Sequence, residues 1–326
     1  GMNAPVTVFG HNGKQYVVGV SNTLQGNGWR EEMICSIKAQ AKVSGQVSKL
    51  IIANKTEGTP QQIADIRNLI SAGANIIIVN PSNPTALNPV IKEATDKGII
   101  VVAVDQAVTE PSAYVLSNDQ VAYGQLGAEW LFKKLNGEGN VVEMRGADGA
   151  QADTDRHQGF EAALQNYPNI KVVKSVFTDW SLAPAAKEIQ DILNSGTKVD
   201  GVWTSGIDAT IVDAFKTAGK PFVPIVGADN NKFVGQLANE QGLVGAAVTN
   251  PPPVGGAGLA LALKVANGDT SVPKLVKLTP EVWDQTDPDK LKAAFDPSLD
   301  PYYAVATDVP GWTTYSKDDL IACQGP

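Results

Sequence analysis

Short apolar segments alternate with segments of helix length along most of the chain. Tyr16–Ser21 (YVVGVS) is rich in valine, and Met33, Ile37 and Ala41 then recur every four residues, as they do on one face of a helix. The next apolar segment, Lys49–Ala53, again leads into an amphipathic stretch. This succession predicts strands that alternate with helices, the pattern of an α/β protein.

The same succession continues as far as residue 266. The expected strands are 16–21, 49–53, 75–79, 99–104, 114–117, 140–144, 171–177, 200–204, 224–227 and 243–248. The expected helices begin near Trp29, Pro60 and Pro84 and continue with 122–136, 152–166, 184–194, 209–218, 233–239 and 254–266. Strands that are apolar on both faces indicate parallel sheets covered by helices on both sides. So many strands exceed a comfortable single open sheet, and 326 residues suffice for two domains, so we expect two doubly wound domains.

The alternation ends at about Ser271. From there to Pro326 the chain is rich in Asp, Pro, Thr and Tyr and carries the aromatic residues Trp283, Trp312 and Tyr315. Large aromatic side chains need burial. We therefore expect an ordered extension, whose path the periodicity does not indicate.

The amino-acid composition excludes several classes of protein. Hydrophobic residues make up 43% of the chain, too many for a disordered protein. A formal net charge of -8 argues against a nucleic-acid partner, because binding to phosphates needs a basic surface. No apolar run approaches the roughly 20 residues that span a bilayer. We therefore expect an acidic two-domain protein without a membrane-spanning helix.

The chain has two cysteines, Cys35 and Cys323, and no Cys-x-x-Cys pair that would offer a zinc or redox site. In an oxidising compartment we expect one disulfide, which ties the C-terminal extension to the first helix; two unrelated thiols are the alternative. The N-terminal residues Gly1–Pro5 have neither a basic segment nor an apolar core. We therefore expect the secretory signal to be absent from this sequence.

Motifs of cofactor-dependent and nucleophilic enzymes are absent from the sequence. The loop after the first strand, GVSNTLQGNGWR, lacks the Gly-x-Gly-x-x-Gly spacing, and neither a Walker A loop nor a Gly-x-Ser-x-Gly elbow occurs. His11 and His157 are the only histidines, which excludes His-rich metal sites and multi-histidine catalysis. We expect both histidines on the surface, and we predict no catalytic residue, metal or cofactor.

Polar side chains follow the expected strands, at the edge where doubly wound sheets bind ligands. They are Ser21, Asn22 and Asn27, Asn80 and Ser82, Asp105 and Gln106, Asn118 and Asp119, Asp179 and Trp180, Ser205 and Asp208, Asp229 and Asn230, and Thr249 and Asn250. Asn, Asp and Ser also cap helices and form turns, and we favour that role for Asn22, Ser82, Asn230 and Thr249.

Two carboxylates and two tryptophans stand out from the polar strand ends. Asp105 and Asp229 each end a strongly apolar strand, where an unpaired carboxylate is costly, so we favour a role in binding for both. Trp29 and Trp180 offer flat faces on which the C–H groups of a sugar can stack, while amides and carboxylates bind several hydroxyls at once. The set favours a neutral sugar or polyol, because phosphate or a dicarboxylate would require more Arg and Lys.

Several ordered motifs point to a known family. They are GVSNTLQGNGWREEM, NIIIVNPSNPTAL, IIVVAVDQAV, SNDQVAYGQLGAEWL, DRHQGFEAAL and PIVGADN, within about residues 15 to 270. These motifs resemble those of the type I periplasmic sugar-binding proteins, in the ribose-binding-like branch that serves ATP-driven importers. The resemblance implies two Rossmann-like domains joined by a three-crossing hinge, with a monosaccharide between them. It also implies an extracytoplasmic monomer, with or without a lipid anchor, that delivers its sugar to the permease of an ABC importer.

The resemblance also assigns ligand contacts to particular positions. Asn27, Trp29, Asp105, Trp180 and Asp229 match sugar contacts, Asn118, Asp119 and Gln120 cover a hinge motif, and Asn250 matches an amide position after the chain crosses back. Gln106 stands where ribose binders have an arginine, and Thr154 replaces the first of two helix arginines, of which Arg156 remains. Gly206 replaces an asparagine, which leaves Ser205 or Asp208 to act. The loss of cationic donors argues against ribose and favours another pentose, a hexose or a polyol.

The implied crossings lie near Ser117, near Asn250 and near Pro273–Leu278. The predicted N-terminal domain comprises residues 1–117 and 251–275 and the C-terminal domain residues 118–250, while 276–326 contain a crossing and the extension. Two other classes stay open: the core of a sugar-responsive repressor without its DNA-binding head, and an enzyme on the same fold. The early first strand counts against the repressor, and the missing cofactor loops count against the enzyme.

Overall fold

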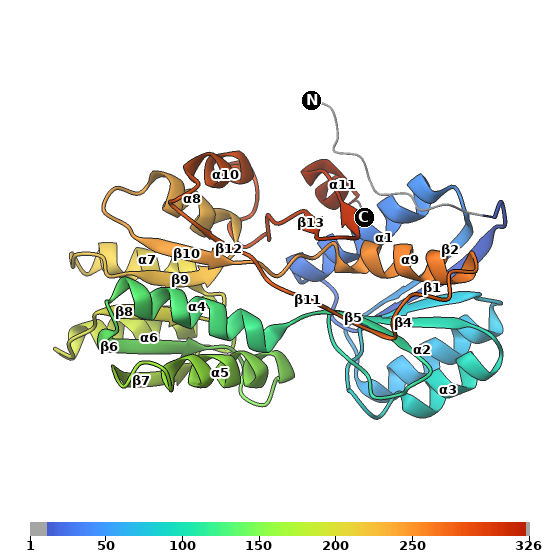
Figure 1. The fold of residues 1–326 in the computed structure, drawn as a ribbon, viewed down its shortest axis with the longest axis horizontal. Helices are drawn as coiled ribbons and strands as arrows, with labels where there is room; N and C mark the ends of the chain where they lie inside the picture. Colours follow the sequence, from blue (N-terminus) through green and yellow to red (C-terminus); the bar gives the residue numbers. More distant parts are fainter. Residues whose placement is uncertain (1–11, 324–326) are drawn as a thin grey trace. The chain divides into compact units, whose positions relative to one another are not determined.

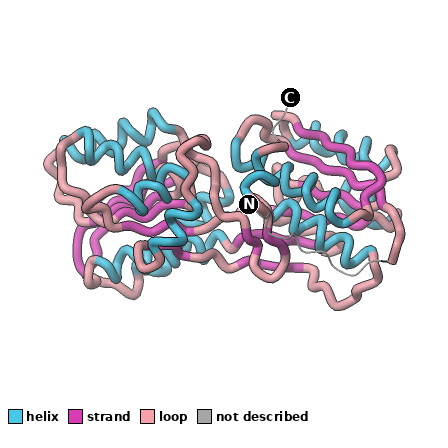
Figure 2. The backbone as a smooth tube through the Cα atoms, turned by 90° about the horizontal axis from the view of Figure 1, so that it is seen from above, coloured by secondary structure: helices cyan, strands magenta, loops and turns pink. Residues whose placement is uncertain are grey.

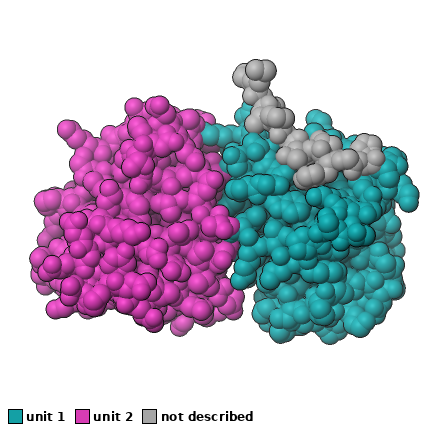
Figure 3. All heavy atoms as spheres, in the orientation of Figure 1, with its two compact units in different colours: residues 1–118, 251–278, 307–326 teal, residues 119–250, 279–306 magenta. Residues whose placement is uncertain are grey.

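The computed structural model describes residues 12–323, so His11 lies outside the described range. Contacts divide the chain into two compact units (Figure 3). Among the described residues, unit 1 comprises 12–118, 251–278 and 307–323, and unit 2 comprises 119–250 and 279–306. The chain therefore passes between the units after residues 118, 250, 278 and 306. The first three passages lie next to the expected crossings, and the C-terminal extension adds the fourth.

Unit 1 is built on a parallel sheet. Its strands lie in the order β11 (Leu275–Leu278), β5 (Tyr114–Asn118), β4 (Ile100–Val104), β3 (Ile76–Val79), β1 (Tyr16–Asn22) and β2 (Val47–Asn54). Helices α1 (Gly28–Ser44) and α9 (Val254–Ala266) cover one face, and α2 (Thr59–Ser71) and α3 (Asn88–Asp96) cover the other (Figure 1). Val102 and Val104 point into the first of these cores, and Val101 and Ala103 point into the second.

Unit 2 repeats this architecture. Its strands lie in the order β12 (Val282–Asp284), β10 (Gly245–Val248), β9 (Ile225–Ala228), β8 (Gly201–Thr204), β6 (Glu138–Arg145) and β7 (Asn169–Phe177), and only β12 is antiparallel to its neighbour. Helices α4 (Gln120–Lys134) and α5 (Gln151–Leu164) pack on one face. Helices α6 (Leu182–Asn194), α7 (Asp208–Thr217) and α8 (Asn231–Asn239) pack on the other. Figure 2 shows strands flanked by helices in both units.

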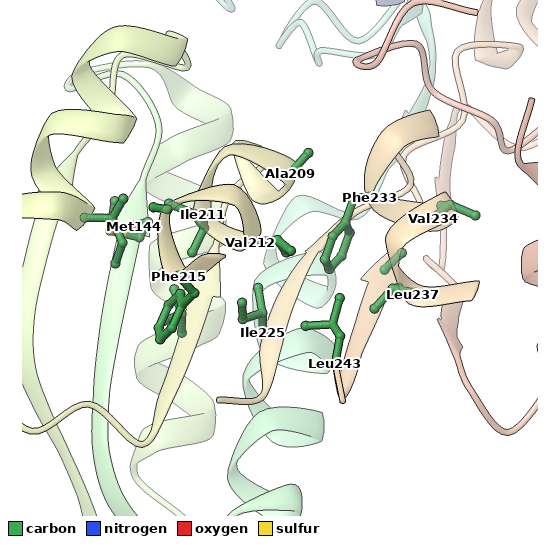
Figure 4. Packing of buried hydrophobic residues seen from close by; sticks show 14 of the residues in the cluster. Met144, Ala209, Ile211, Val212, Phe215, Ile225, Phe233, Val234, Leu237 and Leu243 are labelled. Atoms are coloured by element: carbon green, nitrogen blue, oxygen red, sulfur yellow. The ribbon is translucent and has the colours of Figure 1, made fainter. Parts of the chain in front are cut away.

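The core beneath α7 and α8 illustrates the packing. Val212 and Phe215 of α7 and Phe233 and Leu237 of α8 gather around Ile225 of β9 (Figure 4). All five side chains are almost completely buried. Burial of such side chains contributes about 1.5–3 kcal/mol each. The predicted fold class, two doubly wound α/β domains, is confirmed.

The described part of the C-terminal extension is ordered. It adds α10 (Pro288–Ala294) to unit 2, and the short strands β13 (Asp308–Val309) and β14 (Thr313–Thr314) with α11 (Lys317–Ile321) to unit 1. The expected disulfide between Cys35 of α1 and Cys323 is present. Trp283 and Tyr315 are buried, as expected of aromatic residues in this segment, while Trp312 is partly buried against the unit 1 core.

The ten predicted strands match β1 to β10 within two residues at each end. The helix expected from Pro84 is the clearest difference, because α3 begins only at Asn88. The side chain of Asn83 accepts hydrogen bonds from the amides of Thr85 and Ala86, which holds this segment in a turn. Among residues 12–323, no helix combines the length and the apolar character that crossing a bilayer requires.

Candidate functional site

Two neighbouring strands of unit 1, β3 and β4, end in a connected group of polar side chains. Asn80 follows β3 and Asp105 follows β4, and the amide nitrogen of Asn80 donates to Asp105 Oδ2 at 3.0 Å. Gln106 reaches Asn80 Oδ1 at 3.5 Å. Asp105 has a left-handed backbone (φ +68°), a conformation that a non-glycine residue adopts at some cost. The half-buried carboxylate of Asp105 is therefore held at the sheet edge by its neighbours.

Arg30, in the first turn of α1, belongs to the same group. Its Nη1 donates to Asn22 Oδ1 at 2.8 Å, and Asn22 in turn donates to Asn54 Oδ1 at 2.8 Å. Burial lowers the pKa of the Arg30 guanidinium, and the negative charge of Asp105 opposes that shift. Arg30 is the functional candidate that sequence reasoning missed; its position directly after Trp29 in GNGWR was the available signal.

The first loop places Asn27 and Trp29 near the start of α1. Asn27 caps the helix, since its Oδ1 accepts from the Arg30 amide at 3.1 Å, and its side chain is exposed. Trp29 is half-buried and packs against the core beneath α1 and α9. Both residues therefore have a structural role in the loop, and both keep part of their surface accessible.

Arg156 is the centre of the polar group in unit 2. Its Nε donates to Gln120 Oε1 at 2.9 Å, and its Nη1 donates to the Ser205 carbonyl and hydroxyl at 3.1 and 3.2 Å. Gln120 also donates to Asn250 Oδ1 at 3.2 Å. The guanidinium carbon lies 4.0 Å from the centroid of the Tyr123 ring. Four predicted residues from α4, α5 and the ends of β8 and β10 thus meet at one point.

Trp180 lies at the edge of the Arg156 group. Its indole Nε1 donates to the Ser205 carbonyl at 2.8 Å, and its ring centroid lies 5.9 Å from the Arg156 guanidinium carbon. Asp179 and Trp180 both have left-handed backbones, with φ of +55° and +49°. Gly146 leaves the space that the indole occupies, because a Cβ there would overlap the ring. The Trp180 ring is therefore held in place by its hydrogen bond and by close packing.

Asp208 and Asp229 are buried and bonded to the protein itself. Asp208 accepts from the amides of Ala209 and Ala228, both at 2.8 Å, and from the Asn230 side chain; burial raises its pKa to about 7. Asp229 accepts from the amides of Asn250 and Ala306 at 3.0 and 2.9 Å. Burial raises the Asp229 pKa too, against those hydrogen bonds. Both carboxylates therefore fix loops at the end of the sheet.

The remaining predicted site residues have local bonds. Asp119 caps α4 by accepting from the Ala122 amide at 3.0 Å, and exposed Thr154 donates to the Ala150 carbonyl at 3.2 Å. Asn118 is buried at the end of β5, where it pairs in register with Leu278 of β11. The side chains of Asp119 and Thr154 thus bond the backbone of their own segments.

The four residues predicted to cap helices or form turns also form hydrogen bonds between elements. Asn22 bonds Arg30 and Asn54, Ser82 bonds the side chains of Gln62 and Thr59, Asn230 bonds Asp208 and the Gly206 carbonyl, and Thr249 accepts from the Glu281 amide. Asn230 precedes α8 without a side-chain cap bond. These side chains thus bond between elements, and the Asn22 amide also donates to the Leu24 carbonyl at 3.1 Å, as expected of a turn.

His157 is partly exposed and bonded to a buried carboxylate. Its Nδ1 lies 2.6 Å from Glu143 Oε2, and Ser175 donates to Glu143 Oε1 at 2.6 Å. Glu161 Oε1 lies 3.9 Å from His157 Nε2, so the three side chains form a group of metal-ligand type. Both oxygens of Glu143 already have protein donors. The arrangement therefore serves as a structural hydrogen-bond network on α5 and β6.

Residues 18–270 match the family model described as the periplasmic binding protein domain. The galactofuranose-binding protein YtfQ of Escherichia coli is 32% identical over 212 residues, which cover 62% of this chain and 66% of that protein. The xylitol-binding protein of Mycolicibacterium smegmatis is 30% identical over 212 residues, which cover 64% of this chain and 61% of that protein. The matches thus span just under two thirds of the length of each relative.

Solved structures show the same similarity. The periplasmic binding protein component of the arabinose ABC transporter from Shewanella sp. ANA-3, bound to α- and β-L-arabinofuranose, has a TM-score of 0.75 to this chain. It is 27% identical in sequence, and the match covers 85% of this chain and 95% of that one.

Proposed function

Because the chain belongs to the periplasmic binding protein domain family, we propose that it captures a monosaccharide or polyol and delivers it to an ABC importer. The family predicted from the sequence motifs is confirmed, and it implies an extracytoplasmic location. The named relatives are binding proteins, which agrees with a protein that binds its ligand without transforming it.

The Arg156 group of unit 2 is the observation that carries the proposal. A guanidinium, two amides and a hydroxyl meet beside the indole of Trp180. Such a group offers donors and acceptors for several hydroxyls next to an aromatic face. A sugar or polyol has both kinds of complementary surface, because its hydroxyls lie around an apolar C–H face.

The charges support a neutral ligand. In unit 1 the negative charge of Asp105 acts on Arg30, so this pair is balanced. In unit 2 the guanidinium of Arg156 already donates to Gln120 and Ser205. A phosphate or dicarboxylate would need further cationic donors. A neutral polyhydroxylated molecule needs none.

We assign the ligand contacts to the polar ends of both sheets. The assigned residues are Asn27, Trp29, Arg30, Asp105 and Gln106 of unit 1 and Gln120, Arg156, Trp180, Ser205 and Asn250 of unit 2. One ligand would contact both sets when the units close on it, the hinge movement of periplasmic binding proteins. Asn118, Asp119, Thr154, Asp208 and Asp229 would support this site by fixing the loops around it.

The ligands named for the relatives suggest where to search. They are galactofuranose, xylitol and L-arabinofuranose, which are furanose sugars and an acyclic polyol. We therefore propose a screen of pentoses, hexoses and polyols by thermal shift, followed by titration calorimetry and recovery of the ligand. At least one compound should raise Tm, bind with one molecule per chain and be recovered unchanged. A response restricted to nucleobases or dicarboxylates would contradict the proposal.

Substitution of Gly146 by alanine should weaken binding of the sugar about 2- to 10-fold, the range expected for the loss of one aromatic contact. The added Cβ displaces the indole of Trp180 from its position beside Ser205. Calorimetry with the sugar from the screen measures the change. Gly58→Ala is the matched control, because the Cβ there meets only Pro60 Cδ at 3.7 Å. Equal affinity of Gly146→Ala and the parent would show that Trp180 does not contact the ligand.

A further inference from the structure

The fourth passage of the chain between the units lies in the C-terminal extension, beyond the residues that match the family. The family model ends at residue 270, whereas this passage follows residue 306. The segments on either side of the passage belong to different units. Its mechanical effect therefore depends on how firmly each side is attached to its own unit.

On the unit 2 side, the buried carboxylate of Asp229 holds the passage. Its Oδ2 accepts from the amide of Ala306, the last residue of the unit 2 segment, at 2.9 Å, and its main-chain carbonyl accepts from the Val305 amide at 2.9 Å. The other carboxylate oxygen accepts from the amide of Asn250, the last residue before the second passage, at 3.0 Å. Asp229 is only 1% exposed. One carboxylate thus holds the second and fourth passages next to each other.

On the unit 1 side, the chain is attached within three residues. Val309 is buried in the core beneath α1 and α9, and the Thr307 carbonyl accepts from the Tyr315 amide at 3.2 Å. The Tyr315 hydroxyl donates to Gln40 of α1 at 2.8 Å and lies against Gly256, where a Cβ would overlap it. Gly256 lies in the first turn of α9, shortly after the second passage. The segment after the fourth passage therefore packs against the start of α9, the first helix after the second passage.

The disulfide adds a covalent bond between the end of the extension and unit 1. Cys323 is bonded to Cys35 of α1, the helix that also carries Gln40. Between the attachments at Ala306 and Val309 the chain can span about 10 Å when fully extended. The fourth passage is therefore short, and the disulfide keeps the unit 1 segment attached to α1.

We propose that residues 304–323 act as a hinge strap, a covalently locked fourth connection that runs beside the second passage and limits the relative movement of the two units. Asp229 attaches the strap to unit 2, and Cys35–Cys323 locks it to unit 1. The strap restricts the range of open forms in the absence of ligand. This inference deepens the proposed function, because hinge closure follows from it, but it concerns the protein without ligand.

An insertion tests the strap without altering either attachment. Gly-Ser-Gly placed between Ala306 and Thr307 lengthens the connection by about 10 Å. The same insertion between Gly219 and Lys220, an exposed turn after α7, is the matched control. Small-angle scattering of the ligand-free proteins should show a larger radius of gyration and a broader distance distribution for the strap insertion than for the control. Equal curves for the two insertions would overturn the proposal.

A second variant tests the proposal even if the insertion impairs folding. Cys35→Ser combined with Cys323→Ser should broaden the distance distribution in the same direction, and treatment of the parent protein with dithiothreitol should reproduce the change. Compactness equal to that of the oxidised parent would overturn the role of the disulfide as the lock. None of these measurements uses a sugar. A failure of the sugar screen and a failure of the strap proposal are therefore distinguishable.

Discussion

Replacement of both Cys35 and Cys323 by serine should lower the free energy of unfolding by about 3–5 kcal/mol. The disulfide joins residues separated by 288 positions, so it removes much conformational freedom from the unfolded chain. It also secures Tyr315 and Leu320, both of which are 1% exposed in unit 1. Urea denaturation of the oxidised parent and the double variant measures the difference.

Reduction supplies the control for this experiment. Dithiothreitol should shift the urea midpoint of the parent to that of the double variant and leave the variant unchanged. Thiol titration of the denatured, unreduced parent should detect no free thiol. Two free thiols per chain, or equal midpoints before reduction, would contradict the prediction.

Replacement of Asp105 by asparagine should weaken sugar binding about 10- to 150-fold. Hydrogen bonds to a charged acceptor contribute about 1.5–3 kcal/mol, and each 1.4 kcal/mol corresponds to a tenfold change in affinity. The substitution also removes the negative charge that acts on Arg30 and weakens the acceptor for the Asn80 amide. Titration calorimetry with the sugar identified by the screen measures the loss.

Asp96→Asn is the matched control for Asp105→Asn. Asp96 belongs to the same unit, but it lies at the end of α3 in an exposed pair with Lys92 at 2.8 Å. An exposed pair of this kind contributes little. The control should bind the sugar as the parent does. If Asp105→Asn also binds within twofold of the parent, Asp105 is not a ligand contact.

The strands could be predicted because their residues carry a strong local signal. Ile76–Val79 is apolar at every position and lies between polar turns, which is typical of a central parallel strand. The path of the C-terminal extension could not be predicted, because its strands and α11 are very short and depend on distant partners. Ala306 is held by Asp229, and Tyr315 is held by Gln40. The periodicity of apolar residues carries no information about contacts between distant residues.

The polar sheet ends could be located from the sequence, but the roles of individual residues could not be separated. Asp105 and Asp229 both follow apolar strands, yet Asp105 is half-buried beside a guanidinium and Asp229 is enclosed by backbone amides. The role of Arg30 could not be predicted, because an arginine in the first turn of a helix is ordinarily exposed. Its surroundings become apparent only when β1 and β4 are placed in the same sheet.

The left-handed backbones beside the proposed ligand-binding edges constrain any redesign of specificity. Among residues 12–323, four non-glycine residues have positive φ, and Asp105, Asp179 and Trp180 are three of them. Glycine, asparagine and aspartate tolerate this conformation, whereas β-branched residues do not. In a library that randomised these positions, many variants would therefore have misplaced loops, whatever their ligand preference. A redesign of the proposed sugar site is better directed at Gln106, Gln120 and Asn250, whose backbones have ordinary conformations.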